Sequence, residues 1–428
     1  MDIPLYLGLA LALLVAVQLA VAALGMLRRQ WREEALFRLR RQMLAAELAG
    51  SLKKEEAGAS TWEGWRTFRV TKLVRETADT QSVYFAPEDG RALPRFLPGQ
   101  YVTLSLRMPG ETRPVIRCYS LSHAPGEDYF RCTVKEVPPP AAQPELPFGK
   151  ASRHINRRLA EGELIDLKAP HGNFTLDVSS KTPVVLMGAG IGVTPLLSML
   201  QAVAASGNTR QVLAFLQFRS GEHHPLKCEL AALARQHKNI QLVTAYSAPN
   251  SADVVGGDYD LRGRLSLEVI KKCLRGSDYE CYICGPGSFM ESMVAGLESW
   301  GIAANKIHFE AFGPASVKRV NQVVARPQHC GGVNAANPID VVMEAPEVRF
   351  DLSGVTAPWT EKIESLLQLA EAHHIPVESG CRAGNCGTCA MPIKSGKVVY
   401  STPPGSQPPA GVCLPCICVP DGPLVLQA

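Results

Sequence analysis

The sequence predicts a multidomain protein: an N-terminal transmembrane helix, a small antiparallel β-barrel, an α/β domain with a parallel sheet, and a final α+β domain. Three observations support this. An uncharged apolar segment opens the chain, two differently patterned regions of apolar runs follow, and six of the 13 cysteines lie near the C-terminus. A chain of 428 residues with 46% hydrophobic composition can give several domains cores of their own.

The N-terminal segment is long enough to cross a bilayer, because residues 3–27 carry no charged side chain. No basic residue precedes it and it is longer than the apolar part of a signal peptide, which disfavours cleavage. A buried core helix is the remaining alternative. Several arginines follow the run, so the positive-inside rule predicts a single-pass anchor in the cell inner membrane with the later domains in the cytoplasm.

The spacing of apolar runs and turn residues predicts the boundaries of the remaining segments. Alternating runs separated by turns indicate the barrel, and strand-like runs that alternate with helical ones indicate the α/β domain. A proline-rich insertion, 138–147, is expected to be an exposed loop. We expect these segments: 1–27, transmembrane helix; 28–61, amphipathic helix and linker; 62–182, barrel; 183–313, α/β domain; 314–338, linker; 339–428, α+β domain.

The last domain contains the most specific motif, Cys381-x4-Cys386-x2-Cys389. This spacing is typical of a plant-type [2Fe–2S] cluster, which needs a fourth thiolate from further along the chain. A zinc site would more often show two CxxC pairs, and a disulfide framework suits a secreted protein better. Three cysteines compete for the fourth position: Cys413, Cys416 and Cys418.

This domain resembles plant-type ferredoxins, which implies a β-grasp fold. The ferredoxin pattern around the fourth ligand, L-x-C-x-x-x-P, matches Leu414, Cys416 and Pro420. The resemblance therefore implies that the cluster ligands are Cys381, Cys386, Cys389 and Cys416.

A glycine-rich string, "GAGIGVTP", follows an apolar strand and opens a helix at residues 188–195. Glycines let a pyrophosphate approach the free N–H groups of a helix N-terminus. The string differs from the Rossmann fingerprint and resembles the nucleotide domain of the ferredoxin–NADP reductase superfamily, as does "YICGPG" at 282–287. The resemblance implies NADH or NADPH as cofactor, with Cys284 near the nicotinamide and Arg219 facing the adenosine end. The implied binding residues are Gly188, Gly190, Gly192, Thr194, Pro195, Arg219 and Gly285.

The barrel region contains "RCYSLS", which resembles the RxYS flavin motif of the same superfamily. The resemblance implies that Arg117 contacts a flavin phosphate, Tyr119 packs on the isoalloxazine and Ser120 lies near flavin N5. The segment "LIDLKAPHGNF" favours FAD over FMN, and "IHFEAFGP" implies that Glu310 lies near the flavin. The other implied flavin-binding residues are Ser122, Lys135, Gly149, Ser152 and Phe312. The catalytic candidates are Ser120, Cys284 and Glu310.

The chain as a whole resembles the reductase components of oxygenases, and residues 62–314 resemble the reductase half of flavohemoglobins. This implies a membrane-anchored reductase that passes electrons from NAD(P)H through FAD and the cluster to a protein: an oxygenase, hydroxylase, desaturase or cytochrome. One alternative is a subunit of a respiratory NADH:quinone reductase, although there the ferredoxin domain comes first. Another is a non-catalytic [2Fe–2S] relay or sensor. The small net charge, +4, gives no indication of nucleic-acid binding.

Overall fold

The computed structural model describes residues 62–139, 143–312, 346–360, 363–382, 384, 387–401, 404 and 408–428. The predicted transmembrane helix at 1–27, the segment 28–61 and the linker 314–338 lie outside these residues, as do Cys386 and part of the insertion 138–147. The described part of the insertion is mostly exposed. Within the described ranges, no helix combines the length and apolar character needed to span a membrane.

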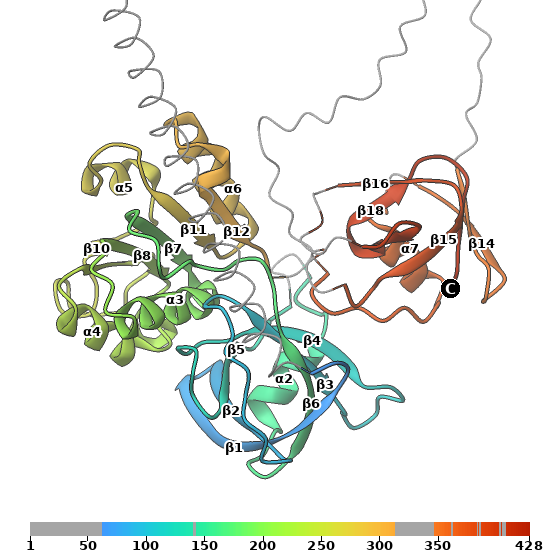
Figure 1. Ribbon diagram of the computed structural model, residues 1–428, viewed down its shortest axis with the longest axis horizontal. Helices are drawn as coiled ribbons and strands as arrows, with labels where there is room; N and C mark the ends of the chain where they lie inside the picture. The colour runs from blue at the N-terminus through green and yellow to red at the C-terminus, as the bar shows by residue number, and fades with distance from the viewer. Residues whose placement is uncertain are drawn as a thin grey trace, which may run out of the picture. The chain divides into compact units, whose positions relative to one another are not determined.

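The first domain is a six-stranded antiparallel sheet, as predicted, with the order β4-β3-β6-β1-β2-β5 (Figure 1). Its two end strands meet through a bridge between Leu121 and Cys132, beside a 2.9 Å hydrogen bond from Ser122 N to Arg131 O, which closes the sheet into a barrel. Helix α2 buries Ile155 in the barrel core. The elements are β1 (Arg66–Thr77), β2 (Thr80–Pro87), β3 (Tyr101–Leu106), β4 (Val115–Ser120), β5 (Phe130–Lys135), α2 (Lys150–Arg157) and β6 (Leu164–His171).

The second domain is a six-stranded parallel sheet with the order β10-β9-β8-β7-β11-β12, again as predicted. Helices α3 and α4 cover one face, and α5 and α6 cover the other. Because both faces are covered, the central strands are almost entirely apolar. The elements are β7 (Val184–Ala189), α3 (Val193–Ala205), β8 (Val212–Phe218), α4 (Lys227–Gln236), β9 (Ile240–Tyr246), β10 (Leu261–Arg262), α5 (Leu267–Cys273), β11 (Glu280–Cys284), α6 (Gly287–Ser299) and β12 (Ile307–Glu310).

The strand order of this sheet reverses beside β7. The chain leaves β7 for β8 on one side and later returns to β11 on the other, so the carboxyl ends of β7 and β11 lie together at a topological switch point. In this register Gly188 pairs with Cys284. Ligands of open α/β sheets bind at such a crevice. The glycine-rich turn of the sequence is located there.

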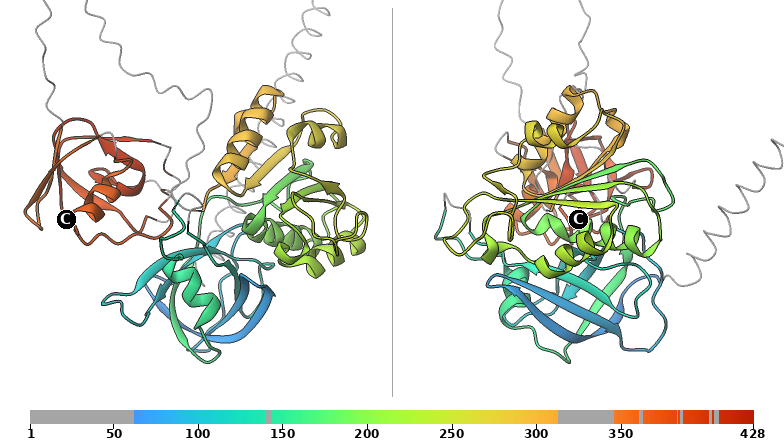
Figure 2. Two further views of the ribbon diagram at one scale, coloured as in Figure 1. Left: turned by 180° about the vertical axis from the view of Figure 1, so that it is seen from behind. Right: turned by 90° about the vertical axis from the view of Figure 1, so that its left-hand side faces the viewer.

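The third domain is a mixed sheet with one helix, which agrees with the predicted α+β class. Strand β13 pairs in parallel with β19 and antiparallel with β14, and helix α7 packs Leu366 and Leu369 against the sheet (Figures 1 and 2). The Ser365 side chain caps α7 by accepting a hydrogen bond from Gln368 N at 3.2 Å. The elements are β13 (Glu347–Phe350), β14 (Val355–Pro358), α7 (Leu366–Ala372), β15 (Met391–Ser395), β16 (Val398–Tyr400), β17 (Val412–Cys413), β18 (Cys418–Pro420) and β19 (Leu424–Leu426).

Candidate functional site

A first cavity lies where the end of β4 meets the end of β12. Arg117 and Ser120 line it from β4, and Glu310 and Phe312 line it from the end of β12 and the segment after it. These four predicted residues come from sequence segments almost 200 positions apart. The fold therefore brings the "RCYS" and "FEAF" motifs to one site.

The first cavity contains buried polar atoms that lack normal hydrogen bonds. Among the described residues, neither Ser120 Oγ nor Glu310 Oε2 makes a hydrogen bond of normal length and angle, although both side chains are buried and the two groups are neighbours. Burial raises the pKa of Glu310 to about 8, and the neighbouring Ser120 hydroxyl opposes this shift. An unsatisfied buried polar group costs about 1–3 kcal/mol, so both atoms favour a polar ligand. The nitrogens and carbonyls of an isoalloxazine ring are suitable partners.

A second cavity, about 310 Å³ in volume, adjoins the first. Its lining combines barrel residues with the glycine-rich turn of the second domain, represented by Ile191 and Thr194. Helix α2 begins after Gly149 at this cavity, and its free N–H groups and nearby cations suit a pyrophosphate. The predicted flavin-binding residues in this lining are Arg117, Tyr119, Lys135, Gly149, Ser152 and Phe312.

Ser152 organises the phosphate end of the second cavity. Its hydroxyl accepts a hydrogen bond from Val137 N and donates one to Gly149 O, both at 3.0 Å. A Cβ atom at Gly149 would lie 3.0 Å from Ser152 Oγ and 3.1 Å from Val137 Cβ. The small residue therefore leaves the helix N-terminus accessible.

The glycine-rich turn packs directly against the end of β11. A Cβ atom on Gly192 would lie 2.2 Å from Cys284 O, and one on Gly188 would lie 2.8 Å from Leu196 Cδ1. Gly190 has φ = +56°, a conformation that favours glycine. Thr194 Oγ1 donates a 3.0 Å hydrogen bond to Ile191 O and so holds the turn against the first turn of α3, which also contains Pro195.

Cys284 and Gly285 lie at the carboxyl end of β11. Cys284 is fully buried and pairs in register with Glu310 of β12. Burial, with a further contribution from Glu310, raises the pKa of the Cys284 thiol well above its usual value. The thiol therefore stays protonated and is a poor nucleophile. The structure thus brings the three catalytic candidates, Ser120, Cys284 and Glu310, to neighbouring positions.

Two predicted residues lie apart from the cavities. Ser122 Oγ contacts Thr133 Oγ1 at 2.8 Å and accepts a hydrogen bond from Arg131 Nε at 3.2 Å. Arg219 is exposed just after β8. Neither is among the described residues that line the two cavities. Their roles in binding stay predictions.

Two of the predicted cluster ligands lie close together. Cys389 Sγ and Cys416 Sγ are 3.3 Å apart, and both are buried in a small cluster with Leu414 and Ile417. Gly384 has φ = +72°, and a Cβ atom there would lie 2.3 Å from Ile417 Cδ1. Cys386 is outside the described residues. The residues that are described contain no group of three side chains able to hold a metal ion.

The two competing cysteines lie in another core. Cys413 and Cys418 belong to the cluster between α7 and the sheet, and their thiols contact one another. This hydrogen bond, together with burial, raises the pKa of Cys418. Thiols are suitable ligands for an iron–sulfur cluster, and Cys389 and Cys416 lie close together in one small core. Both facts fit a cluster bound by Cys416 rather than by Cys413 or Cys418.

Sequence reasoning missed several residues that line the cavities. Cys118 lines both cavities, and Tyr101 and Thr133 each line one. Tyr101 pairs with Ser120 across β3 and β4, which brings it into the cavity. This strand pairing could not be derived from the motifs.

Glu310 is expected to make the stability of the flavin-free protein depend on pH. Its folded pKa of about 8 exceeds its usual value of 4.5, so its stabilising contribution is complete below about pH 4.5 and is lost as the pH rises through 8. Glu310→Gln should remove this dependence. Urea unfolding between pH 5 and pH 9 should show the wild type losing stability relative to the variant as the pH rises. If the free energies of unfolding of the two proteins changed in parallel with pH, Glu310 would not be the group responsible.

Three family models match the chain in succession. An oxidoreductase FAD-binding domain matches residues 67–176, an oxidoreductase NAD-binding domain matches 186–295, and a 2Fe-2S iron-sulfur cluster binding domain matches 350–421. The first two contain most of the lining of the second cavity, and the third contains the cysteine pair. Glu310 and Phe312 lie beyond the NAD-binding match, and the first cavity is also lined by Gly380, Cys381 and Arg382 of the third match. The predicted cofactors FAD, NAD and [2Fe–2S] are confirmed at the level of these domains.

Known proteins match the same regions. A flavohemoprotein from Bacillus cereus is 34% identical over 273 residues, which is 64% of this chain and 66% of that protein. The flavohem-like FAD/NAD binding domain of nitric oxide dioxygenase from Vibrio cholerae matches at 30% identity and a TM-score of 0.52, over 58% of this chain and 99% of the other. Phthalate dioxygenase reductase shares the fold over 86% of this chain and 98% of its own, with 20% identity and a TM-score of 0.52. The chain is therefore an oxidoreductase that joins the FAD- and NAD-binding domains of the ferredoxin–NADP reductase superfamily to a C-terminal 2Fe–2S domain.

Proposed function

We propose that this protein is a membrane-anchored NAD(P)H-dependent reductase that delivers electrons through FAD and a [2Fe–2S] cluster to an oxygenase or hydroxylase. The observation that carries the proposal is the second cavity, in which the barrel motifs and the glycine-rich turn line one space. A flavin seated there has a nucleotide-binding crevice beside it. The order of the matched domains places the iron–sulfur domain after this unit.

The cavity linings support the following roles for the protein's own groups. Arg117, Lys135 and the α2 N-terminus bind the FAD phosphates, and Tyr119 and Phe312 pack beside the ring. When bound, FAD supplies the chemistry that converts a two-electron hydride donor into single electrons, and the cluster carries one electron at a time. Glu310 and Ser120 hold hydrogen-bonding positions next to the ring, and buried Glu310 retains a proton near neutral pH.

The crevice between β7 and β11 suits the nicotinamide nucleotide. The turn from Gly188 to Gly192 leaves room for its pyrophosphate at the start of α3, with Thr194 and Pro195 in the first helical turn. Gly285 and Cys284 border the nicotinamide end, where the buried thiol serves as a neutral packing group. Arg219, exposed after β8, faces the adenosine end and accommodates either NADH or NADPH.

The sequence supports the proposed membrane anchor, and the chemistry of the last domain supports a protein that accepts single electrons. Residues 3–27 are uncharged and long enough to cross the inner membrane, with the folded domains in the cytoplasm. A terminal one-electron carrier needs a partner that accepts electrons singly, such as an oxygenase, hydroxylase, desaturase or cytochrome. The respiratory quinone-reductase alternative is disfavoured by the domain order, and the relay alternative by the intact flavin cavities.

Replacing each C-terminal cysteine by alanine tests the cluster ligands. Cys416→Ala should abolish or strongly weaken the visible absorbance and the reduced-state EPR signal, because Cys416 lies 3.3 Å from Cys389. Cys413→Ala and Cys418→Ala serve as matched controls and should keep both signals, since these thiols pack in the other core. The reverse pattern would overturn the assignment.

The Cys416→Ala protein also tests the order of electron transfer. NAD(P)H-dependent reduction of ferricyanide should persist, because ferricyanide draws electrons from the flavin. Reduction of cytochrome c should fall substantially, because this one-electron protein acceptor depends on the cluster. Equal loss of both activities in a folded, FAD-containing variant would contradict the proposed order.

Deleting residues 1–50 tests the anchor. The shortened protein should remain in the supernatant after ultracentrifugation and keep its ferricyanide activity, whereas the full chain should sediment with membranes. Turnover with the membrane-bound acceptor should fall, because anchoring raises the effective concentration of the two proteins. Sedimentation of both forms in the same fraction would argue against the anchor.

A further inference from the structure

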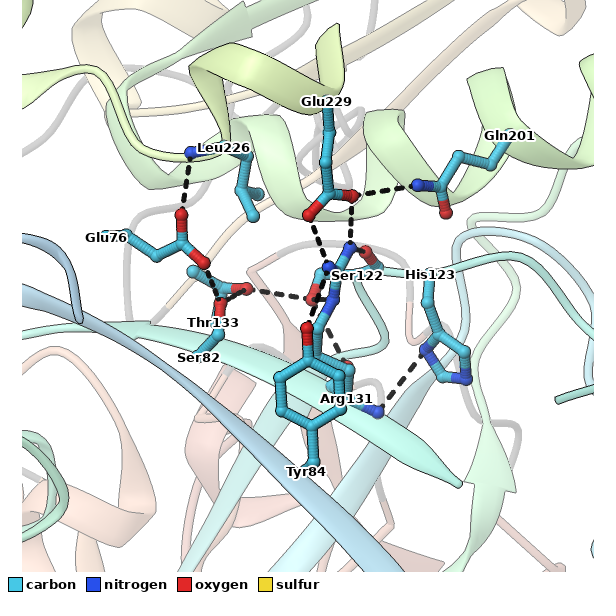
Figure 3. A network of polar contacts seen from close by, with 10 residues as sticks. All are labelled: Glu76, Ser82, Tyr84, Ser122, His123, Arg131, Thr133, Gln201, Leu226 and Glu229. Carbon is cyan, nitrogen blue, oxygen red and sulfur yellow. Dashed lines mark hydrogen bonds and ion pairs between the residues drawn. The ribbon is translucent and has the colours of Figure 1, made fainter. Parts of the chain in front are cut away.

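A network of polar contacts joins the FAD-binding domain to the NAD-binding domain, and of its labelled residues only Thr133 also lines a cofactor cavity. Figure 3 shows Arg131 of β5 at its centre, with Glu229 of α4 on the opposite side of the interface. The Arg131 side chain is only 4% exposed, although it carries a full charge. We call Arg131, Ser122, Glu229 and Gln201 the interdomain clamp.

The Arg131 guanidinium uses all of its nitrogens in this clamp. Nη1 and Nη2 donate to Glu229 Oε1 and Oε2 at 2.6 and 3.0 Å, a bidentate ion pair. Nε donates to Ser122 Oγ at 3.2 Å, and Nη2 also donates to Ser122 O. Gln201 Nε2 of α3 donates to Glu229 Oε2 at 2.9 Å and so fixes the carboxylate from its own domain. The arginine of this pair is buried and the Glu229 side chain is 37% exposed. Charged, bidentate pairs of this kind set a specific orientation.

Two further hydrogen bonds cross the same interface. Ser198 Oγ of α3 donates to His123 O at 2.7 Å. Leu226 N, just before α4, donates to Glu76 Oε2 at 3.2 Å, and the other oxygen of Glu76 accepts from Ser82 Oγ at 2.6 Å. Leu226 has φ = +60°, which is unusual for a residue with a side chain, and the Glu76 contact holds it there. The interface is thus defined at three points.

The clamp adjoins the segments that form the cofactor site. Ser122 lies two residues after Ser120, and Ser198 lies one helical turn after Thr194. Yet Ser122 and Glu229 are not among the described residues that line either cofactor cavity. Glu229 and Ser122 therefore do not border a cofactor directly, and a change at Glu229 acts on the cofactors through the relative position of the two domains and through the contact of Ser122 with Thr133 at the second cavity.

We infer that the Arg131–Glu229 pair is a positioning pair for hydride transfer from the nicotinamide to the flavin. In that step a hydride leaves C4 of the dihydronicotinamide, which becomes a pyridinium, and FAD gains the two electrons and the hydrogen nucleus. The donor belongs to one domain and the acceptor to the other, so the interface sets their separation. A misplacement of about 1 Å can cost roughly 100-fold in rate. The inference rests on the proposed function.

Glu229→Gln is the informative variant. It keeps the shape of the side chain but leaves the buried Arg131 without its counter-ion, and a buried charge that loses its partner is strongly disfavoured. The domains should then separate to hydrate the guanidinium. Glu280→Gln is the matched control: Glu280 also pairs with a buried arginine, Arg210, at 3.2 Å, but within the NAD-binding domain and at the opposite end of its strands.

The first measurement is hydrogen–deuterium exchange without nucleotide. In the Glu229→Gln protein, backbone amides in the peptides that cover Ser122–Arg131 and Leu226–Gln236 should exchange faster than in the wild type, and those of the barrel core should not. Glu280→Gln should match the wild type in these peptides. Unchanged exchange at the interface in Glu229→Gln would overturn the inference.

The second measurement is stopped-flow reduction of the bound flavin. With saturating NADH or NADPH, Glu229→Gln should be slower by about tenfold or more, with the dissociation constant of the oxidised nucleotide changed less than about threefold. Reduction by dithionite, which needs no domain alignment, should proceed as in the wild type. Equal rates in Glu229→Gln and Glu280→Gln would overturn the inference, as would slowing that comes only from weaker nucleotide binding.

A second variant covers the case in which Glu229→Gln does not fold. Gln201→Leu removes only the hydrogen bond by which an uncharged donor orients Glu229, and it should slow flavin reduction by about twofold to fivefold with normal FAD content. An unchanged rate would count against the clamp. Failure of the proposed function looks different, because the wild-type flavin itself would then not be reduced by either nucleotide.

Discussion

The close approach of the glycine-rich turn to the end of β11 is the constraint on which the cofactor site depends. The backbone at Gly192 comes so near the carbonyl of Cys284 that any Cβ atom would overlap it. This contact places the start of α3 at the crevice between β7 and β11. It also brings Ile191 and Thr194 into the lining of the second cavity, where they meet barrel residues. One packing requirement thus fixes the nucleotide crevice and one wall of the flavin site together.

In the absence of FAD, the polar groups buried in the flavin site lower the stability of the folded chain. Ser120 and Glu310 are buried with polar atoms that lack normal hydrogen bonds among the described residues, and burial keeps the carboxyl protonated to about pH 8. A ligand that satisfies these atoms stabilises the folded state by mass action. FAD is therefore expected to act as a structural component as well as a redox group, and its loss should lower the stability of the barrel.

Short motifs allowed the sequence to predict about half of the cavity residues, because each motif combines a strand end with a turn. Arg117 and Glu310 line the first cavity, and Gly192 lies in the turn against the end of β11. The Leu–Cys–Pro pattern likewise pointed to Cys416, and the structure places that thiol beside Cys389. The Arg131–Glu229 pair could not be predicted, because its partners are 98 positions apart and neither belongs to a motif. Ser122 shows the same limit: its place in "RCYSLS" implied flavin binding, whereas its hydroxyl contacts Arg131 and Thr133.

The hairpin from Ser120 to Cys132 combines three structural roles. Its first residue lies in the flavin site, the bridge between Leu121 and Cys132 closes the barrel, and Arg131 reaches the neighbouring domain. This has a consequence for chimeric reductases. In a chimera joined near Thr182, the foreign NAD-binding domain would pack against a hairpin whose side chains match the surface of the original domain. Exchanges that transplant the hairpin with the nucleotide domain, or that restore an acid opposite Arg131, should give the better-coupled hybrids.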